Sequence, residues 1–269
     1  MARLYRATVA CASIVALLSV ARPADAQFAG PRDPAIGEVY STELLGGLWN
    51  PTPVIVVSSD APGMVGTDID AVSDLGVIQK RHRELRLVLR PAWQHKVRIQ
   101  YLPMEYQADT VLNRAVVFEG LTYDVGRPVT TTVTWRTWRF GYEYDVIYRD
   151  RGFVGVIVEV KYTDIETRLE GPIGVTAART RTPIPAIGGI GRVYPLSNVS
   201  LTVELTGVKL PNTSYQTKHV DLDAYGTLNF SDSLGIQVGY RSLDLDYRFD
   251  EEAGRLTLEG WYVAGVVRF

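Results

Sequence analysis

His219 is the residue of this 269-residue chain best placed for proton-transfer chemistry, because a hydroxyl and two carboxylates stand close to it in the sequence. Ser214 precedes it, and Asp221 and Asp223 follow it. A lipid hydrolase or acyltransferase embedded in a membrane would need such a group of side chains, with the hydroxyl within hydrogen-bond reach of the imidazole. A lone histidine beside acids is more commonly a polar residue near a strand end, so we assign no catalytic residue.

The two other histidines have simpler interpretations. His95 lies at a short turn, where solvation explains it, and His82 lies in the basic cluster 80–83, which could meet anionic lipid headgroups. Neither position indicates a metal or a cofactor. The acidic pair Asp68 and Asp70 does not have the spacing of a calcium-binding loop.

Charged residues alternate with apolar ones over residues 138–162. Aromatic or aliphatic residues occupy the even positions from Trp138 to Tyr148 and from Val154 to Tyr162, and charged residues occupy odd positions between them. A period of two indicates β-strands with two different faces. The long strands, the tyrosines on the apolar face and an N-terminal export signal favour a barrel with lipid outside and a polar lumen.

The same alternation assigns a set of charged side chains of both signs to the lumen. In a narrow barrel the interior is filled by side chains, and an unpaired charge away from water is costly. We therefore expect a network of salt bridges that plugs the lumen; the alternative is a narrow passive channel for small polar solutes with a charged lining. The lumen residues are His82, Glu84, Arg86, Arg90, Arg98, Arg139, Glu143, Asp145, Glu159, Lys161, Arg192, Glu204, Asp221, Asp223 and Arg241.

The N-terminus has the features of a secretory signal peptide. Arg3 and Arg6 precede the apolar run 7–20, and the small residues around Ala26 match a cleavage site. The run is shorter than the ~20 residues of a spanning helix. We expect residues 1–26 to be a signal peptide and residues 27–269 to form one barrel domain. Cleavage after Ala26 would remove Cys11, the only cysteine, so the mature chain would contain no disulfide.

The last ten residues end a strand on an aromatic residue. Trp261, Val263, Val267 and Phe269 alternate along it, and Tyr262 lies on the opposite face. This pattern resembles the terminal assembly signal of Gram-negative outer-membrane β-barrel proteins. The resemblance implies a small single-chain barrel in the cell outer membrane, in contact with its lipids, that meets the barrel-assembly machinery through Tyr262, Val267 and Phe269.

The sequence predicts an all-β, antiparallel transmembrane meander barrel of about ten strands, with eight as the alternative. Nine strands follow from the alternation, and 37–49 is the best candidate for the tenth, because bacterial barrels usually have even strand numbers. We expect short turns at 91–94, 149–152, 195–198 and 231–233, and longer loops at 50–76, 166–182, 211–218 and 249–255. The glycines at 188, 189 and 191 indicate curvature or close packing within a strand.

Composition limits the possible functions. The net charge of −2 argues against nucleic acid as a partner, and a mean hydropathy of +0.01 would suit a barrel in which only every other residue is apolar. We expect a monomeric integral outer-membrane barrel without a cofactor, closed by its salt bridges, with a structural or surface-interaction role. A passive channel and a lipid-modifying enzyme are the alternatives.

Overall fold

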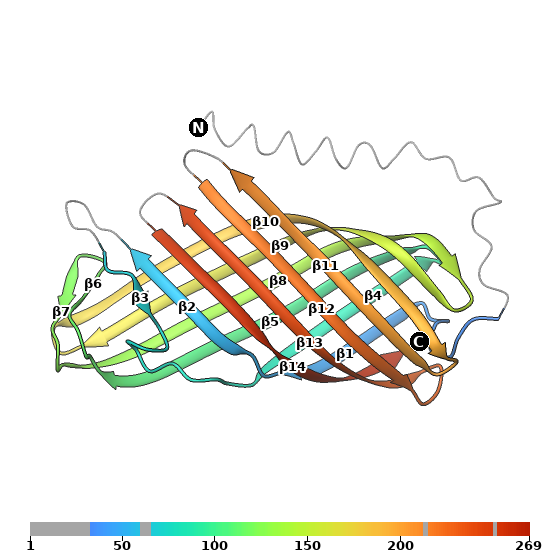
Figure 1. Cartoon of the computed structure of the whole chain (residues 1–269), viewed down its shortest axis with the longest axis horizontal. Helices are drawn as coiled ribbons and strands as arrows, with labels where there is room; N and C mark the ends of the chain where they lie inside the picture. Colours follow the sequence, from blue (N-terminus) through green and yellow to red (C-terminus); the bar gives the residue numbers. More distant parts are fainter. Residues whose placement is uncertain (1–32, 60–65, 212–214, 250–251) are drawn as a thin grey trace. The chain divides into compact units, whose positions relative to one another are not determined.

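The computed structural model describes residues 33–59, 66–211, 215–249 and 252–269, so the expected signal peptide lies outside the described residues. All regular elements in these ranges are β-strands (Figure 1). They are β1 (Thr42–Trp49), β2 (Thr52–Ser59), β3 (Ile69–Asp70), β4 (His82–Ala92), β5 (His95–Val111), β6 (Val116–Phe118), β7 (Leu121–Tyr123), β8 (Pro128–Arg149), β9 (Gly152–Gly171), β10 (Gly174–Leu196), β11 (Val199–Pro211), β12 (Tyr215–Asn229), β13 (Leu234–Phe249) and β14 (Glu252–Arg268).

No helix among these residues has both the length and the apolar character needed to span a bilayer.

The strands form a closed antiparallel 10-strand barrel. The order around the wall is β1, β4, β5, then β8 to β14, and β14 pairs with β1 to close it. Leu44 is opposite Val267 at this closure, and the amide of Thr42 donates to the carbonyl of Phe269 at 3.1 Å. The prediction of an antiparallel meander with ten strands is confirmed, and its eight-strand alternative is wrong.

Two successive strands, β1 and β2, share the same side of β14. The C-terminal half of β14 pairs with β1, as at Tyr262 and Trp49, whereas its N-terminal half pairs with β2. The predicted loop 50–76 is therefore wrong, because residues 52–59 and 69–70 are strands. The segment Val54–Val57 is apolar on both faces, and a continuous apolar run hides the alternation by which strands are recognised.

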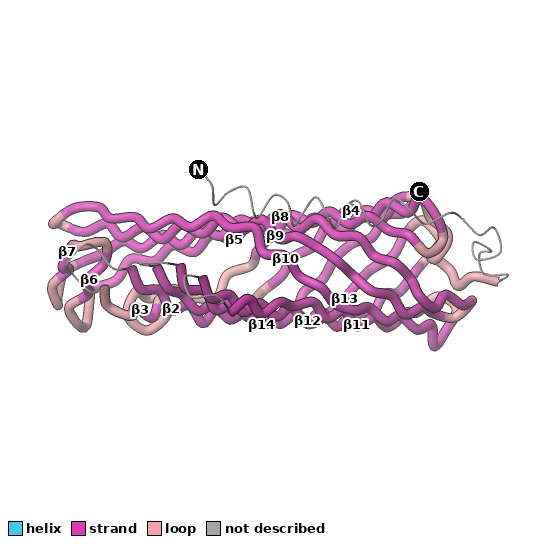
Figure 2. Tube along the Cα trace, turned by 90° about the horizontal axis from the view of Figure 1, so that it is seen from above, coloured by secondary structure: helices cyan, strands magenta, loops and turns pink. Residues whose placement is uncertain are grey.

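The predicted loop 166–182 is also wrong. β9 continues to Gly171 and β10 begins at Gly174, and the two pair along this whole stretch (Figure 2). Inward positions such as Ile165 and Leu169 are buried, but the outward positions carry charges, as in Glu166 and Arg168. Inward and outward residues still alternate here, but the outward residues are polar and no longer apolar. Similarly, strands occupy most of the predicted loops 211–218 and 249–255, and the four predicted short turns are confirmed.

An apolar band surrounds the barrel on its outer face. On β8 the band runs from Trp138 to Ile147, a length of tilted strand that corresponds to about 25 Å, the height of the apolar band of transmembrane barrels. A bulge between Asp145 and Ile147 turns Tyr148 inward, so the expectation that this tyrosine lies on the apolar outer face is wrong. Aromatic rings stack at the edge nearer the long-loop end, where Tyr101 and Trp138 have centroids 4.4 Å apart. Beyond this edge, β5, β8, β9 and β10 continue as extended arms that stay paired in one sheet (Figure 2).

The interior consists of two parts. Near the short turns it is filled by charged side chains, and toward the long-loop end it is filled by apolar ones such as Leu102, Trp135 and Leu258. Segments outside the wall complete this apolar core: Leu75 and Phe118, from the stretches that follow β3 and form β6, are almost completely buried.

The mouth at the short-turn end is occupied by residues 33–41. Asn229 Nδ2 donates to the carbonyl of Ile36 at 2.7 Å, and the amide of Gly37 donates to Asp232 at 3.0 Å. Gly37 has φ 79°, and a Cβ there would lie 2.6 Å from Arg268, so the turn requires glycine. The predicted strand 37–49 therefore begins only at Thr42, and the residues before it enter the lumen.

Candidate functional site

The residues predicted to line the lumen point into the barrel, and the charged ones lie together in the half near the short turns. All the predicted residues are less than a tenth exposed, and their side chains come from β4, β5 and β8 to β13. His82, at the other end of β4, lies against Tyr106 in the apolar half. The charged members are Glu84, Arg86, Arg90, Arg98, Arg139, Glu143, Asp145, Glu159, Lys161, Arg192, Glu204, Asp221, Asp223 and Arg241. We call them, together with Glu38 and Lys96, the lumen cluster.

Glu204 on β11 connects opposite walls of the barrel. One carboxylate oxygen lies 2.6 Å from Arg98 Nη2 on β5, and the other accepts a hydrogen bond from Arg139 on β8. Arg98 also pairs with Glu143 at 3.1 Å, and Arg139 also donates to Glu159. The two pairs of Glu204 cross the lumen and join strands that are not neighbours in the sheet, whereas the pairs with Glu143 and Glu159 join neighbouring strands.

Asp221 on β12 forms a second centre. It accepts from Arg241 and from Lys161, each at 2.8 Å, and it lies 3.6 Å from Arg139. The aspartate is thus surrounded by three cations, one of which also belongs to the centre around Glu204. The two centres are continuous through Arg139.

Glu84 and Asp223 belong to a third group of charges that shares Arg241 with the second centre. Arg86 Nη2 lies 3.1 Å from Glu84 and 3.3 Å from Asp223, and Arg241 lies 3.6 Å from Glu84. Tyr262 donates its phenolic hydrogen to Asp223 at 2.9 Å. Of the three residues expected to form the assembly signal, Tyr262 thus points inward, whereas Val267 and Phe269 are 37% and 70% exposed on the outer face.

Glu38 is one of the two members of the lumen cluster that sequence reasoning missed. Its carboxylate lies 3.3 Å from both Arg90 and Arg192, and Tyr148 and Tyr194 donate hydrogen bonds to it. Because Glu38 precedes β1, strand alternation could not have assigned it to the lumen.

Lys96 was also missed, although its even-numbered position shares a strand face with Arg98. Its ammonium lies 2.7 Å from Glu143 and 2.9 Å from Asp145. Its position two residues before Arg98, on the same face of β5, was sufficient to assign it to the lumen. Arg268 and Glu43, 2.6 Å apart, form a further buried pair between the last strand and the first.

Little space remains between these side chains. A cavity beside Arg139, Lys161 and Asp221 has a volume of about 10 Å³, and another beside Phe118 in the apolar half is of the same size. Such a volume is close to the smallest that holds one water molecule.

His219 lies inside the barrel and not at a rim that faces lipid. It is 2% exposed, and its Nε2 is 3.4 Å from Lys161 Nζ. Its two neighbouring acids are engaged elsewhere: Asp221 is bound to Arg241 and Lys161, and Asp223 to Arg86 and Tyr262. Ser214 lies outside the described residues. Among the described residues, this imidazole therefore has no free carboxylate beside it, and we assign it no catalytic role.

The other two histidines have ordinary packing roles. His95 Nδ1 shares a hydrogen bond with the hydroxyl of Tyr142 near a short turn. His82 is buried, with its ring 4.8 Å from that of Tyr106, so it does not itself reach lipid headgroups. Lys80, Arg81 and Arg83 around it are exposed, and their contact with headgroups stays a prediction. No cluster of potential metal ligands occurs among the described residues.

Solved structures of outer-membrane barrels resemble this one. The outer membrane protease OmpT from Escherichia coli matches with a TM-score of 0.60 and 7% identity over 85% of this chain and 96% of that one. Ail of Yersinia pestis, in complex with a heparin analogue, gives 0.38, with 8% identity over 83% and 99% of the two chains. The Pseudomonas putida toluene transporter TodX gives 0.36, with 7% identity over 88% and 92%.

No family model matches the chain, and no curated protein matches it in sequence. The similarity to OmpT is one of architecture, because 7% identity shows the fold alone. It agrees with the closed wall of ten antiparallel strands, the apolar outer band and the polar lumen. The chain thus has the fold of Gram-negative outer-membrane β-barrel proteins.

Proposed function

We propose that this protein is a monomeric, closed barrel of the cell outer membrane with a structural or surface-interaction role. Residues 1–26 would direct its export and be cleaved off after Ala26. The last strand, with Phe269 and Val267 on its outer face, would engage the barrel-assembly machinery, and the apolar band would face the membrane lipids. The lumen cluster would hold the wall together and let nothing pass.

The crossing of the lumen by Arg139 is the observation that supports closure. This side chain from β8 reaches Glu204 on β11 and Asp221 on β12, and the adjacent cavity has only about 10 Å³. A conducting pore would need the charges to be separated by water. Removing one partner of a buried ion pair typically costs about 3–5 kcal/mol, so such a network resists opening.

The polar arms beyond the apolar band would supply the interaction surface. Asp164 on the outer face of β9 pairs with Arg179 at 2.6 Å and with Arg181 at 3.1 Å, both on β10. Nearby Arg168 and Glu170 are also half-exposed. Arms that are paired in one sheet and carry charges of both signs suit recognition of a partner outside the membrane better than they suit transport.

Conductance in a planar bilayer tests the closed state. The refolded mature protein should insert without current steps, with insertion checked separately by protease protection in lipid vesicles. As a matched control, the variant Arg139→Ala with Glu204→Ala removes both partners of one pair across the lumen and should conduct small ions. Current steps from the unmodified protein would support the channel instead and overturn the proposal.

A further inference from the structure

A groove crosses the apolar outer face of the barrel where β10, β11 and β12 lie side by side. It has a volume of about 630 Å³. Gly189 and Gly191 on β10 leave its floor without side chains, opposite Leu205 and Val203 on β11. Outer-face residues of the neighbouring strands, among them Val220, form its sides.

The groove is fixed by the backbone and does not depend on side-chain rotamers. At Gly188 the neighbouring strand approaches so closely that a Cβ would lie 1.9 Å from the carbonyl oxygen of Leu205. Only glycine permits this approach. At Gly191, by contrast, a Cβ would meet nothing within 4 Å, because this residue faces the open groove.

Two lysines stand at the end of the groove, where the outer face changes from apolar to charged. Lys209 on β11 and Lys218 on β12 are exposed and are directly opposite each other in the sheet. Lys209 lies two residues after the groove residue Gly207, and Lys218 lies two residues before the groove residue Val220. Each lysine is thus on the same strand face as that groove residue and about 7 Å from it. Like charges directly opposite each other destabilise a sheet, so an anion bound between the two lysines would relieve their repulsion.

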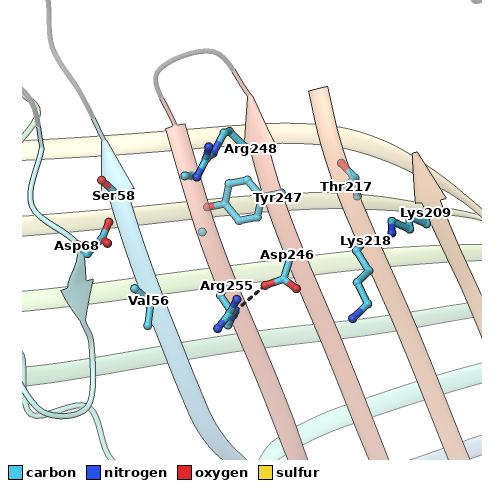
Figure 3. A pocket seen from close by; sticks show the side chains of 12 residues that line it. Val56, Ser58, Asp68, Lys209, Thr217, Lys218, Asp246, Tyr247, Arg248 and Arg255 are labelled. Atoms are coloured by element: carbon cyan, nitrogen blue, oxygen red, sulfur yellow. Dashed lines mark hydrogen bonds and ion pairs between the residues drawn. The ribbon is translucent and has the colours of Figure 1, made fainter. Parts of the chain in front are cut away.

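The two lysines lie in a region where positive charges outnumber negative ones. They line a second cavity, of about 660 Å³, together with Arg248, Arg255 and the acids Asp68 and Asp246 (Figure 3). Asp246 is the sheet neighbour of Lys218, but it is ion-paired with Arg255 at 2.7 Å. An apolar groove and a cationic cavity thus adjoin at the edge of the apolar band.

We propose that this surface binds one membrane lipid with a phosphate headgroup. An acyl chain lies in the groove over Gly189 and Gly191, and the phosphate lies between Lys209 and Lys218. The charge of the lysines and the level at which they stand determine the choice of occupant, because cationic side chains beside an apolar band attract anionic headgroups. The inference rests on the proposed placement of the barrel in a membrane.

Native mass spectrometry of the mature protein with phosphatidylglycerol, and with phosphatidylcholine of the same acyl chains, tests the headgroup site. The protein should retain phosphatidylglycerol selectively. The variant Lys209→Gln with Lys218→Gln should weaken this binding by about thirtyfold, because each lysine near a membrane surface contributes roughly a factor of five. The control Arg127→Gln with Arg168→Gln removes two exposed charges beyond the apolar band, away from the groove, and should bind normally.

A second variant tests the groove. Gly191→Leu fills it without a backbone clash and should weaken phosphatidylglycerol binding while binding of glycerol phosphate, which has no acyl chain, is unchanged. Each variant is first checked for insertion into vesicles. Unchanged selectivity in the lysine variant, equal affinity for glycerol phosphate and the lipid, or a dimer in which the groove is covered would overturn the inference. Failure of the unmodified protein to insert would overturn the proposed function as well.

Discussion

Glu38 and Arg192, 154 residues apart in the chain, form an ion pair of 3.3 Å inside the mouth of the barrel. The glutamate belongs to the segment before β1 and the arginine to β10. The pair therefore fastens the N-terminal segment within the lumen, next to Arg90, which the same carboxylate also neutralises.

Replacing this glutamate should destabilise the barrel. Glu38→Gln leaves Arg90 and Arg192 without their carboxylate, and we expect a loss of about 3 kcal/mol in the free energy of unfolding by urea in lipid vesicles. Glu105→Gln, at an exposed position of β5, serves as the control and should change stability by less than about 0.5 kcal/mol. Equal stability of the two variants would show that the mouth contact is not maintained.

The close approach of β10 and β11 should make Gly188 intolerant of substitution. Gly188→Ala would place a methyl group 1.9 Å from the carbonyl oxygen of Leu205 and should prevent normal folding, whereas Gly191→Ala should fold like the parent. The heat-modifiable mobility of the folded barrel in electrophoresis measures both. A normally folded Gly188→Ala protein would contradict the geometry of this strand pair.

A charge placed in the middle of the apolar band should be costly in a membrane. Val156→Arg on β9 should reduce stability in lipid vesicles by about 2–4 kcal/mol, the range found at the bilayer midplane. Val125→Arg, in an exposed turn outside the band, should have little effect. If the two substitutions were tolerated equally, the outer face of β9 would be in contact with water.

The contact between Asp74 and Arg114 should give the segment after β3 a dependence on pH. Hydrogen bonds from the Arg114 guanidinium, at 3.0 and 2.6 Å, lower the pKa of Asp74 below its usual value. The stabilisation is complete above that usual value and is lost as the pH falls through the lowered pKa. The protection of residues 66–81 from hydrogen exchange, relative to the intrinsic rate at each pH, should fall at acidic pH, and Asp74→Asn should remove this dependence. Equal pH dependence in both would refute the role of Asp74.

The wall was predictable from the sequence wherever its outer face is apolar. From Trp138 to Asp145 and from Val154 to Tyr162, the alternation reports both the strands and the side that each residue faces, so Arg139 and Glu159 could be assigned to the lumen in advance. The alternation does not reveal the bulge after Asp145, which turns Tyr148 inward. Where the outer face becomes polar, as at Glu166 and Arg168, a paired strand has the composition of a loop. Where both faces are apolar, as in β2, the period disappears.

The inner charges were predictable as a set, but their partners were not. The alternation along β11 specifies which side of the sheet Glu204 faces. Its pairing with Arg98 and Arg139 depends on the diameter and register of the closed barrel. Glu38 could not be found by this method, because its segment has no partner strand. Its place in the mouth follows only from the folded arrangement.

The meeting of the two chain ends imposes an order on assembly. The amides of Ser41 and Thr42 donate to the carbonyl of Phe269, and Leu44 lies opposite Val267. The final seam therefore joins the most distant parts of the sequence, and it can form only after all the intervening hairpins are in place. Contacts of such long sequence separation form slowly. Until then the nascent sheet has two open edges, so a chaperone that holds both edges would set the rate at which this protein matures.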